Sequence, residues 1–285
     1  MRTGSKCLLG SSIVLVLLGS CFGAFYEDFS ADWGGENILL NEGVNGVDLR
    51  LTTNTGARFA SRNSYLFGAF SVNMKLIAGN SAGTACSFYL TSYGDSHDEI
   101  DFEFLGNVSG QPYVLHTNVF GHGKGEREQR MFLWFDPTAD FHNYSVIWNH
   151  RHVTWYVDNT PIRVFRNLES KYPNTYLNTE AQVVSGSIFD ASTWATRGGL
   201  IPIDWNSAPF IVKFRDFSFN ACHVVNNDVT NCKKQNARNW WEAKNLDRAS
   251  IARMRSVTKK YRFYDYCTDK VRNPTPPAEC RYNNL

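Results

Sequence analysis

Three carboxylates alternate with apolar side chains in residues 97–103, which read His-Asp-Glu-Ile-Asp-Phe-Glu. Successive side chains of a β-strand point to opposite faces, so a strand here would carry Glu99, Asp101 and Glu103 on one face, together with His97. The intervening apolar side chains then form the other face. Like charges at neighbouring positions raise one another's pKa values, which is a poor choice for structure but useful for general acid and base catalysis.

Cleavage of a glycosidic bond needs two carboxyl groups, one ionised to attack the sugar and one protonated to assist the leaving oxygen. The same alternation also suits a solvated face of an antiparallel sheet, or a cation site built from oxygen ligands. A cation site more often draws its ligands from a loop rich in Gly, Asn and Asp, and no such loop surrounds Glu99. We expect neither a metal nor an organic cofactor, because two carboxyl groups suffice.

Short apolar and aromatic runs separated by turn signals fill residues 25–220, without a long helical period. The clearest alternating runs are residues 47–51, 71–76, 144–148, 153–157 and 211–219, with a turn at 158–161. This spacing predicts an all-β sandwich or jelly roll. Two curved sheets packed together leave a concave face, and we expect a polymer to lie there.

The sequence changes character after Asn220. Apolar residues spaced among charged ones in 237–255 predict one amphipathic helix, and residues 262–267 predict a final strand. An extension of this size cannot hold a large core of its own, so we expect it to pack on the sandwich. The predicted division is a signal peptide at 1–23, a jelly-roll domain at 24–220 and a disulfide-stapled extension at 221–285.

Four cysteines cluster in the extension, and Cys86 lies alone in an apolar segment. Four cysteines allow three pairings, and an oxidising compartment favours bridges. We favour the sequential pairs, Cys222 with Cys232 and Cys267 with Cys280, because both close short loops. Cys86 has no activating partner nearby in the sequence, and we expect a buried free thiol.

Residues 1–23 have the pattern of a secretory signal peptide, with a basic start at Arg2 and Lys6. The apolar stretch at 7–18 is shorter than the roughly 20 residues that span a bilayer, so we expect a secreted protein without a membrane anchor. Removal of the peptide leaves 27 Lys and Arg against 27 Asp and Glu. This balance gives no basic field that would predict nucleic-acid binding.

Two N-glycosylation sequons occur, at Asn107 and Asn143. Asn107 follows the acidic strand at a turn flanked by glycine, and it is the better candidate for a glycan. Asn143 enters a predicted strand, and we expect it to be unused.

The segment 97–106 resembles the catalytic strand of the plant xyloglucan endotransglucosylase/hydrolases, in glycoside hydrolase family 16. Other segments resemble that family in the same order along the chain, at residues 65–68, 79–84, 116–120, 134–138, 194–199 and 266–269. The resemblance implies a concanavalin-like β-jelly roll with a curved substrate cleft. It also implies a secreted enzyme of the plant cell wall or apoplast.

The resemblance implies that Glu99 is the nucleophile of a retaining mechanism, Glu103 the general acid/base and Asp101 an assisting group. The enzyme would cleave a β-1,4-glucan, with xyloglucan as the leading candidate, and transfer it to the 4-hydroxyl of another glucan. Its expected partners are a polysaccharide donor and an oligo- or polysaccharide acceptor, bound by a monomer. The sugar contacts carried over are Glu103, His116, Thr117, Asn118, Glu126, Arg127, Glu128, Thr193, Trp194, Gly198 and Arg272.

The chain departs from the family near the expected acceptor side. Family members commonly carry Tyr-Ser-Ser-Leu-Trp-Asn where residues 185–190 read Ser-Gly-Ser-Ile-Phe-Asp, and Thr193 replaces an acid. Reduced stacking area there leaves a less decorated β-1,4-glucan such as cellulose as an alternative substrate. The segment 185–199 lacks the extra loop expected for hydrolytic members, which favours transfer. An endo-hydrolase is the alternative, and a non-catalytic lectin is a remote one, because a lectin has no need of both Glu99 and Glu103.

Overall fold

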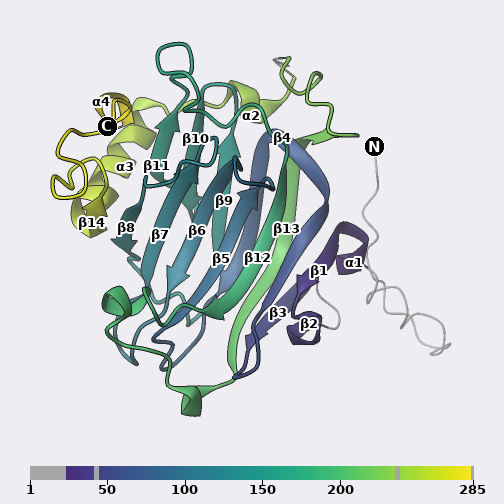
Figure 1. Cartoon of the computed structure of the whole chain (residues 1–285), viewed down its shortest axis with the longest axis vertical. Helices are drawn as coiled ribbons and strands as arrows, with labels where there is room; N and C mark the ends of the chain where they lie inside the picture. Colours follow the sequence, from purple (N-terminus) through teal and green to yellow (C-terminus); the bar gives the residue numbers. More distant parts are fainter. Residues whose placement is uncertain (1–23, 42–44, 235–237, 284–285) are drawn as a thin grey trace.

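The computed structural model describes residues 24–41, 45–234 and 238–283 (Figure 1). The predicted signal peptide, residues 1–23, lies outside this described part of the chain. Within the described ranges, no helix has the length and apolar character needed to cross a bilayer.

Antiparallel strands make up most of the fold, and four α-helices lie near the two ends of the described chain. The strands are β1 Phe29–Trp33, β2 Ile38–Leu40, β3 Gly46–Leu51, β4 Ala57–Lys75, β5 Thr84–Thr91, β6 Glu99–Leu105, β7 Val114–Phe120, β8 Gln129–Phe132, β9 His142–Trp148, β10 His152–Val157, β11 Thr160–Arg166, β12 Gln182–Asp190, β13 Phe210–Val224 and β14 Arg262–Asp265. The α-helices are α1 Ala24–Asp28, α2 Trp240–Ala243, α3 Arg248–Tyr261 and α4 Cys280–Asn283, with 3₁₀ turns at Gly35–Asn37, Thr196–Gly199 and Trp205–Ser207.

Strand β4 belongs to both layers of the sandwich. Residues 57–65 pair with β12 and β1, whereas residues 68–75 pair with β9 and β13. The change of layer falls between Ser64, which pairs with both β12 and β13, and Gly68, where an added Cβ atom would lie 2.3 Å from that of Ala221. One layer therefore runs β1-β4-β12-β5-β6-β7-β8-β14, and the other runs β11-β10-β9-β4-β13-β3-β2.

The apolar side of β6 faces the core between the layers. Phe102 and Phe104 are fully buried, and their ring centroids lie 5.8 and 4.7 Å from that of Tyr144 on β9. Edge-to-face aromatic pairs of this kind stabilise a core beyond the area that they bury. The indole nitrogen of Trp155, on β10, also donates to the backbone oxygen of Asp101 at 3.0 Å. The prediction of an all-β jelly-roll sandwich is confirmed.

The predicted amphipathic helix of the extension is present, but its bounds differ from residues 237–255. The structure has a short helix, α2, and then α3, which begins at Arg248 and continues to Tyr261. Asp247 separates them because its side chain accepts a hydrogen bond from the backbone nitrogen of Ser250 at 2.7 Å, which caps α3. The predicted final strand is present as β14, although it ends at Asp265.

The C-terminal segment attaches along one edge of the sandwich, where Figure 1 places α3, α4 and β14 beside β8 and β11. Strand β14 extends the first layer by pairing with β8. At the other end of the segment, β13 continues past the boundary predicted at residue 220 and ends at Val224. The division into two domains therefore stays a prediction.

Both disulfides join the predicted sequential pairs, Cys222 with Cys232 and Cys267 with Cys280. The first ties the end of β13 to the loop that follows it, and the second ties the turn after β14 to α4. Cys86 is a buried free thiol on β5, as expected, and burial raises its pKa. A thiol held in its neutral form is a poor nucleophile.

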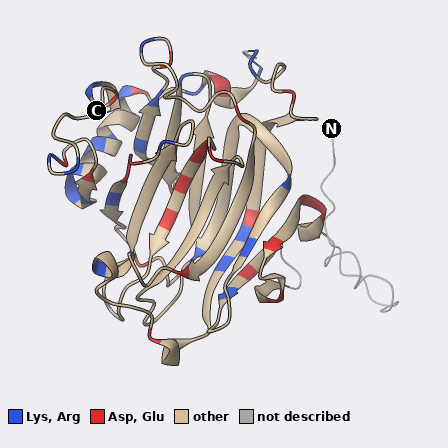
Figure 2. Cartoon of the chain, viewed as in Figure 1, with Lys and Arg blue, Asp and Glu red and all other residues tan. Residues whose placement is uncertain are grey.

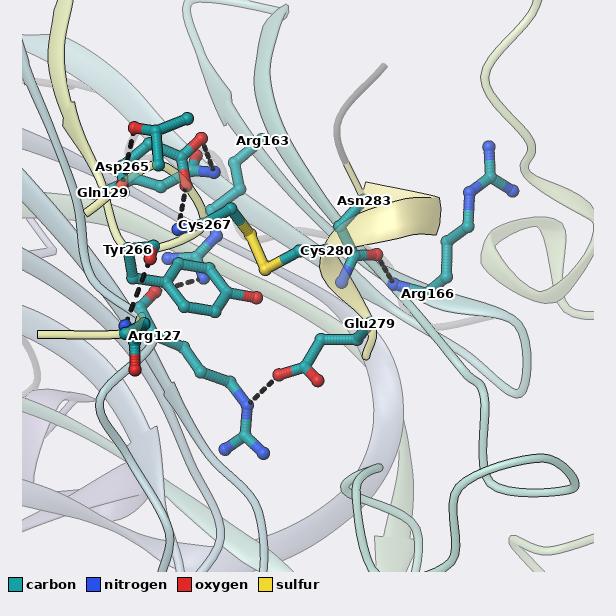
Figure 3. Close-up of a disulfide and its surroundings, with 12 residues drawn as sticks. Arg127, Gln129, Arg163, Arg166, Asp265, Tyr266, Cys267, Glu279, Cys280 and Asn283 are labelled. Carbon is teal, nitrogen blue, oxygen red and sulfur yellow. Dashed lines mark hydrogen bonds and ion pairs between the residues drawn. A yellow bond between two sulfur atoms is a disulfide. The ribbon is translucent and has the colours of Figure 1, made fainter. Parts of the chain in front are cut away.

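A buried ion pair links the sandwich to the C-terminal segment beside the second disulfide (Figure 3). The Nε atom of Arg127 lies 3.0 Å from Oε1 of Glu279, and the two side chains are only 9% and 7% exposed. Burial removes the hydration of both charged groups, and their mutual attraction compensates for this desolvation cost.

Substitution Glu279→Ala should lower the free energy of unfolding by about 3–5 kcal/mol, because it leaves the Arg127 charge buried without its partner. Urea unfolding followed by tryptophan fluorescence measures this loss. Glu126→Ala is the matched control, since Glu126 pairs with Arg272 at the surface, where such a pair contributes less than about 1 kcal/mol. Equal unfolding midpoints for the two variants would contradict the prediction.

Candidate active site

The three acids lie in a row on the outer face of β6, at the middle of the first layer. Figure 2 shows them as red bands along this strand. Their neighbours across the sheet are Thr91, Tyr89 and Ser87 on β5, and Phe120, Asn118 and His116 on β7. Because opposite residues of an antiparallel pair share a face, these side chains surround the acids. We call this surface, defined by Glu99, Asp101 and Glu103, the acid face.

Burial and mutual repulsion favour protonation of two of the acids. Desolvation, followed by the charge of Glu99, raises the pKa of Glu103 to about 7, while Arg130 opposes the shift. The pKa of Asp101 also lies well above its usual value, because its side chain is buried and because Glu99 and Glu103 are close. A hydrogen bond between the Asp101 and Glu99 side chains acts in the same direction. A proton is therefore available on this face near neutral pH.

His116 lies beside Glu103 without forming a charged pair. Its Nδ1 atom is 3.6 Å from Oε2 of Glu103. Burial and the positive charges of Arg130 and Arg163 lower the pKa of His116 to about 3, so the ring is neutral at physiological pH. The ring of Trp194 stands edge-on to it at 6.4 Å between centroids. This places an aromatic side chain from the loop after β12 close to the acids.

Polar side chains continue from the acids toward β14. Arg272 donates to Oε2 of Glu128 at 2.7 Å and lies 3.4 Å from Oε1 of Glu126. Glu128 lines a pocket of about 600 Å³ together with Glu126 and Asn118. A second pocket, of about 320 Å³, is lined by Gly198 and Arg130 among others. Thr193, Trp194 and Gly198 are exposed on the loop that follows β12.

Three residues lie differently from the sequence-based expectation. Thr117 is opposite Phe102, so its side chain points inward, where Arg163 donates to its hydroxyl at 2.9 Å. Arg127 is buried and pairs with Glu279. His97 precedes β6 instead of lying in it, and its ring packs on Phe120 at 4.9 Å. Strand alternation explains the position of Thr117. Its neighbours His116 and Asn118 point to the acid face, and successive side chains of a strand point to opposite faces.

Several side chains that surround the acids were not predicted from the sequence. Tyr89 lies opposite Asp101, Arg130 lies opposite His116, and Trp155 bonds to the backbone of Asp101. Arg58, on β4, lies over the ring of Tyr89. Arg58, Arg130 and Trp155 come from strands far from residues 97–103 in the sequence, so only the strand pairing reveals them; Tyr89 comes from β5, the strand just before β6. The one signal in the sequence was the strand-like pattern of residues 84–91, which could have placed Tyr89 on a strand next to β6.

The sandwich has the fold of known glycoside hydrolases. The β-glucanase of Bacillus licheniformis superposes with a TM-score of 0.54 at 20% identity, covering 67% of this chain and 91% of that one. The Crh5 transglycosylase superposes with a TM-score of 0.52 at 21% identity, covering 67% of this chain and 79% of that one. Residues 25–207 match the family model described as glycosyl hydrolases family 16.

Closer relatives define the subgroup. Xyloglucan endotransglucosylase protein 7 of Diospyros kaki is 46% identical over 90% of this chain and 97% of the relative. Probable xyloglucan endotransglucosylase/hydrolase protein 6 of Arabidopsis thaliana is also 46% identical, over 90% of this chain and 88% of the relative. Residues 235–280 match the model described as the xyloglucan endo-transglycosylase C-terminus. The chain belongs to the xyloglucan endotransglucosylase/hydrolase family, within glycosyl hydrolases family 16.

Proposed function

We propose that this chain is a cell-wall endotransglucosylase that cleaves a β-1,4-glucan backbone, first of all xyloglucan, and transfers it to the 4-hydroxyl of another glucan chain. The observation that carries the proposal is the row of Glu99, Asp101 and Glu103 on one face, with a raised pKa at Glu103. A retaining mechanism needs one carboxyl that holds a proton and one that attacks.

In the first step, Glu103 gives its proton to the leaving glycosidic oxygen while Glu99 attacks the anomeric carbon. A covalent ester between Glu99 and the donor glycan forms, and the glycosidic bond breaks. Asp101 orients the Glu99 carboxylate through the hydrogen bond that joins them. In the second step, Glu103 is a carboxylate and removes the proton from the attacking hydroxyl, which restores both groups.

The acceptor chain binds, in this proposal, on the side of the acids that faces β7, β8 and β14. His116, Asn118, Glu126, Glu128 and Arg272 offer hydrogen-bonding groups there, and Trp194 offers a stacking surface. Thr193 and Gly198 shape the adjoining loop. Arg127 contributes by anchoring the segment that carries Glu126 and Glu128, because its own side chain pairs with Glu279. An acceptor held firmly on this side outcompetes water, which favours transfer.

Localisation, domain division and glycosylation complete the proposal. We place it in the plant cell wall as a secreted monomer without a membrane anchor, after removal of residues 1–23. Its sandwich, residues 24–220, carries the catalytic acids, and residues 221–285 extend the acceptor side. Asn107 carries a glycan, since it is half-exposed directly after β6.

Product analysis tests the proposed function. The purified protein is incubated with xyloglucan or a soluble cellulose derivative, with and without a fluorescent oligosaccharide acceptor, and polymer size and label are followed together. Label in long chains with a constant number of reducing ends supports transfer. Reducing ends that rise without label transfer would make the chain an endo-hydrolase, and binding without turnover would make it a lectin.

The value of kcat/KM for a polymer donor should fall as the pH rises through about 7. Glu103 must be protonated in the free enzyme for the first step, and its raised pKa means that this proton is lost in that range. His116, with its pKa lowered to about 3, adds no titration between pH 5 and 8. A pH–rate profile measured at constant ionic strength checks this. A profile that stays flat to pH 9, or that already falls near pH 5, would contradict the assignment.

A further inference from the structure

Arg58 lies on the acid face, although nothing in the proposed mechanism uses it. It is opposite Ser187 on β12, which is opposite Ser87 on β5, which is opposite Glu103. Each step keeps the side chains on one face. Three strand spacings of about 4.8 Å put the Arg58 backbone about 14 Å from that of Glu103. Arg58 can therefore affect how a glycan binds, but it does not touch the reacting atoms.

Several contacts hold the guanidinium group in one place. Its Nη1 atom lies 2.9 Å from Oδ2 of Asp32, and its Nη2 atom donates to the hydroxyl of Ser185 at 3.2 Å. The guanidinium carbon lies 5.4 Å from the centre of the Tyr89 ring. The side chain is 16% exposed, and its Nε atom is buried without a hydrogen-bond partner in the described structure. An arginine fixed in this way loses little entropy when it binds a ligand.

Tyr89 connects this group to the acids. It lies opposite Asp101, and the charges of Glu99 and Asp101 contribute to the rise of its pKa after the effect of burial. The face therefore has polar and aromatic groups on both sides of the acids. Arg272 and Trp194 lie on the side assigned to the acceptor, and Arg58 lies on the other side, where the donor chain must run.

The local charge decides which kind of sugar fits. Asp32 already neutralises Arg58, and among the described residues the acid face carries carboxyl groups and no free cation beside Arg58 that would attract an anion. A uronic acid or other anionic sugar would be repelled. A neutral sugar would instead find donors on Arg58 and an acceptor on Asp32, which is 36% exposed in its side chain. Charged side chains that bind hydroxyl groups directly are strong hydrogen-bonding partners.

The neighbouring departure from the family makes room for this arrangement. Ser185 stands where family members commonly carry a tyrosine, and it is fully buried beneath the guanidinium group that bonds to it. Ser185 lies opposite Tyr89, so a tyrosine there would occupy the acid face next to that ring. In this chain the space is filled by a charged, hydrogen-bonding group in place of a second aromatic ring.

We infer that Arg58, together with Asp32 and Tyr89, forms a subsite for a neutral sugar unit of the donor chain, and that Arg58 determines donor specificity by binding the hydroxyl groups of an unsubstituted glucosyl residue. The inference rests on the proposed function, because it takes the bound polymer to be a β-glucan. Arg58 acts on donor binding and leaves the chemical step unchanged.

Transfer kinetics of Arg58→Ala and Arg58→Met test the inference, with the methionine variant keeping an apolar stem over Tyr89. Three donors are compared at a fixed acceptor concentration: a cello-oligosaccharide long enough to reach Arg58, carboxymethyl cellulose, and an oligosaccharide too short to reach Arg58. We expect KM for the long cello-oligosaccharide to rise about tenfold, the scale of one hydrogen bond to a charged group, with kcat unchanged. KM for the short donor should not change.

Arg62→Ala is the matched control, because Arg62 lies on the same strand but is exposed and bonds to the backbone of Tyr26. Unchanged KM values for all three donors in the Arg58 variants would overturn the inference, as would an equal change for the long and the short oligosaccharide or a loss of kcat. A change confined to carboxymethyl cellulose would overturn it in favour of an anion site. Failure of the unmodified protein to turn over any glucan would instead refute the proposed function itself.

Discussion

Substitution Glu99→Gln is expected to reduce both transfer and hydrolysis by on the order of 10⁴-fold or more, the scale observed when an enzyme loses its nucleophile. Glutamine keeps the shape of the side chain but cannot form the covalent ester. Initial rates with a polymer donor and a labelled acceptor measure the loss. Retained activity in the purified variant would refute the assignment of Glu99 as the nucleophile.

The fold of this variant should remain intact. Glu99 is half-buried on the acid face, and its charge raises the pKa values of Asp101 and Glu103. Removing that charge relieves repulsion, so thermal unfolding should occur at the same temperature or slightly higher. A clear drop in the unfolding temperature would mean that the loss of activity reflects misfolding.

Substitution Glu103→Ala is expected to slow turnover of polymer donors by roughly 10²–10⁴-fold, the usual contribution of a general acid. The sugar oxygen of a polymer is a poor leaving group that needs a proton. A donor with an activated aryl leaving group departs without that help, so its first step should change little. Pre-steady-state release of the aryl group separates this step from the second.

The comparison between the two donors is the decisive part of that experiment. His116→Ala is a suitable control, because His116 lies 3.6 Å from Glu103 but is neutral and cannot replace it as the acid. The same loss for aryl and polymer donors would show that Glu103 is not the proton donor of the first step.

Alternation made much of the sandwich predictable from the sequence. Residues 144–148 and 153–157 lie in β9 and β10, as their runs of apolar and aromatic residues predicted. The length of β4 was not predictable, since its crossing between layers depends on contacts with β13 that lie far away in the sequence. The break between α2 and α3 was missed because the apolar spacing alone does not reveal the Asp247 cap.

The candidate site divides in the same way. Glu99, Asp101 and Glu103 could be assigned to one face because their spacing and strand geometry are local. Tyr89 and Arg58 could not, because their positions depend on which strands lie side by side. Thr117 shows the limit of transferring a motif as a block: the register that puts His116 and Asn118 on the acid face turns Thr117 inward.

Trapping of the covalent intermediate tests whether Glu99 is the nucleophile of a retaining mechanism. The protein is treated with a fluorinated β-glucan oligosaccharide that carries a good leaving group, which forms the glycosyl-enzyme but slows its breakdown. Digestion and mass spectrometry then locate the added sugar. We expect one sugar adduct per chain, on Glu99, and no adduct in the Glu99→Gln variant. An adduct on Asp101 or Glu103, or turnover of natural donors without any adduct, would contradict this assignment.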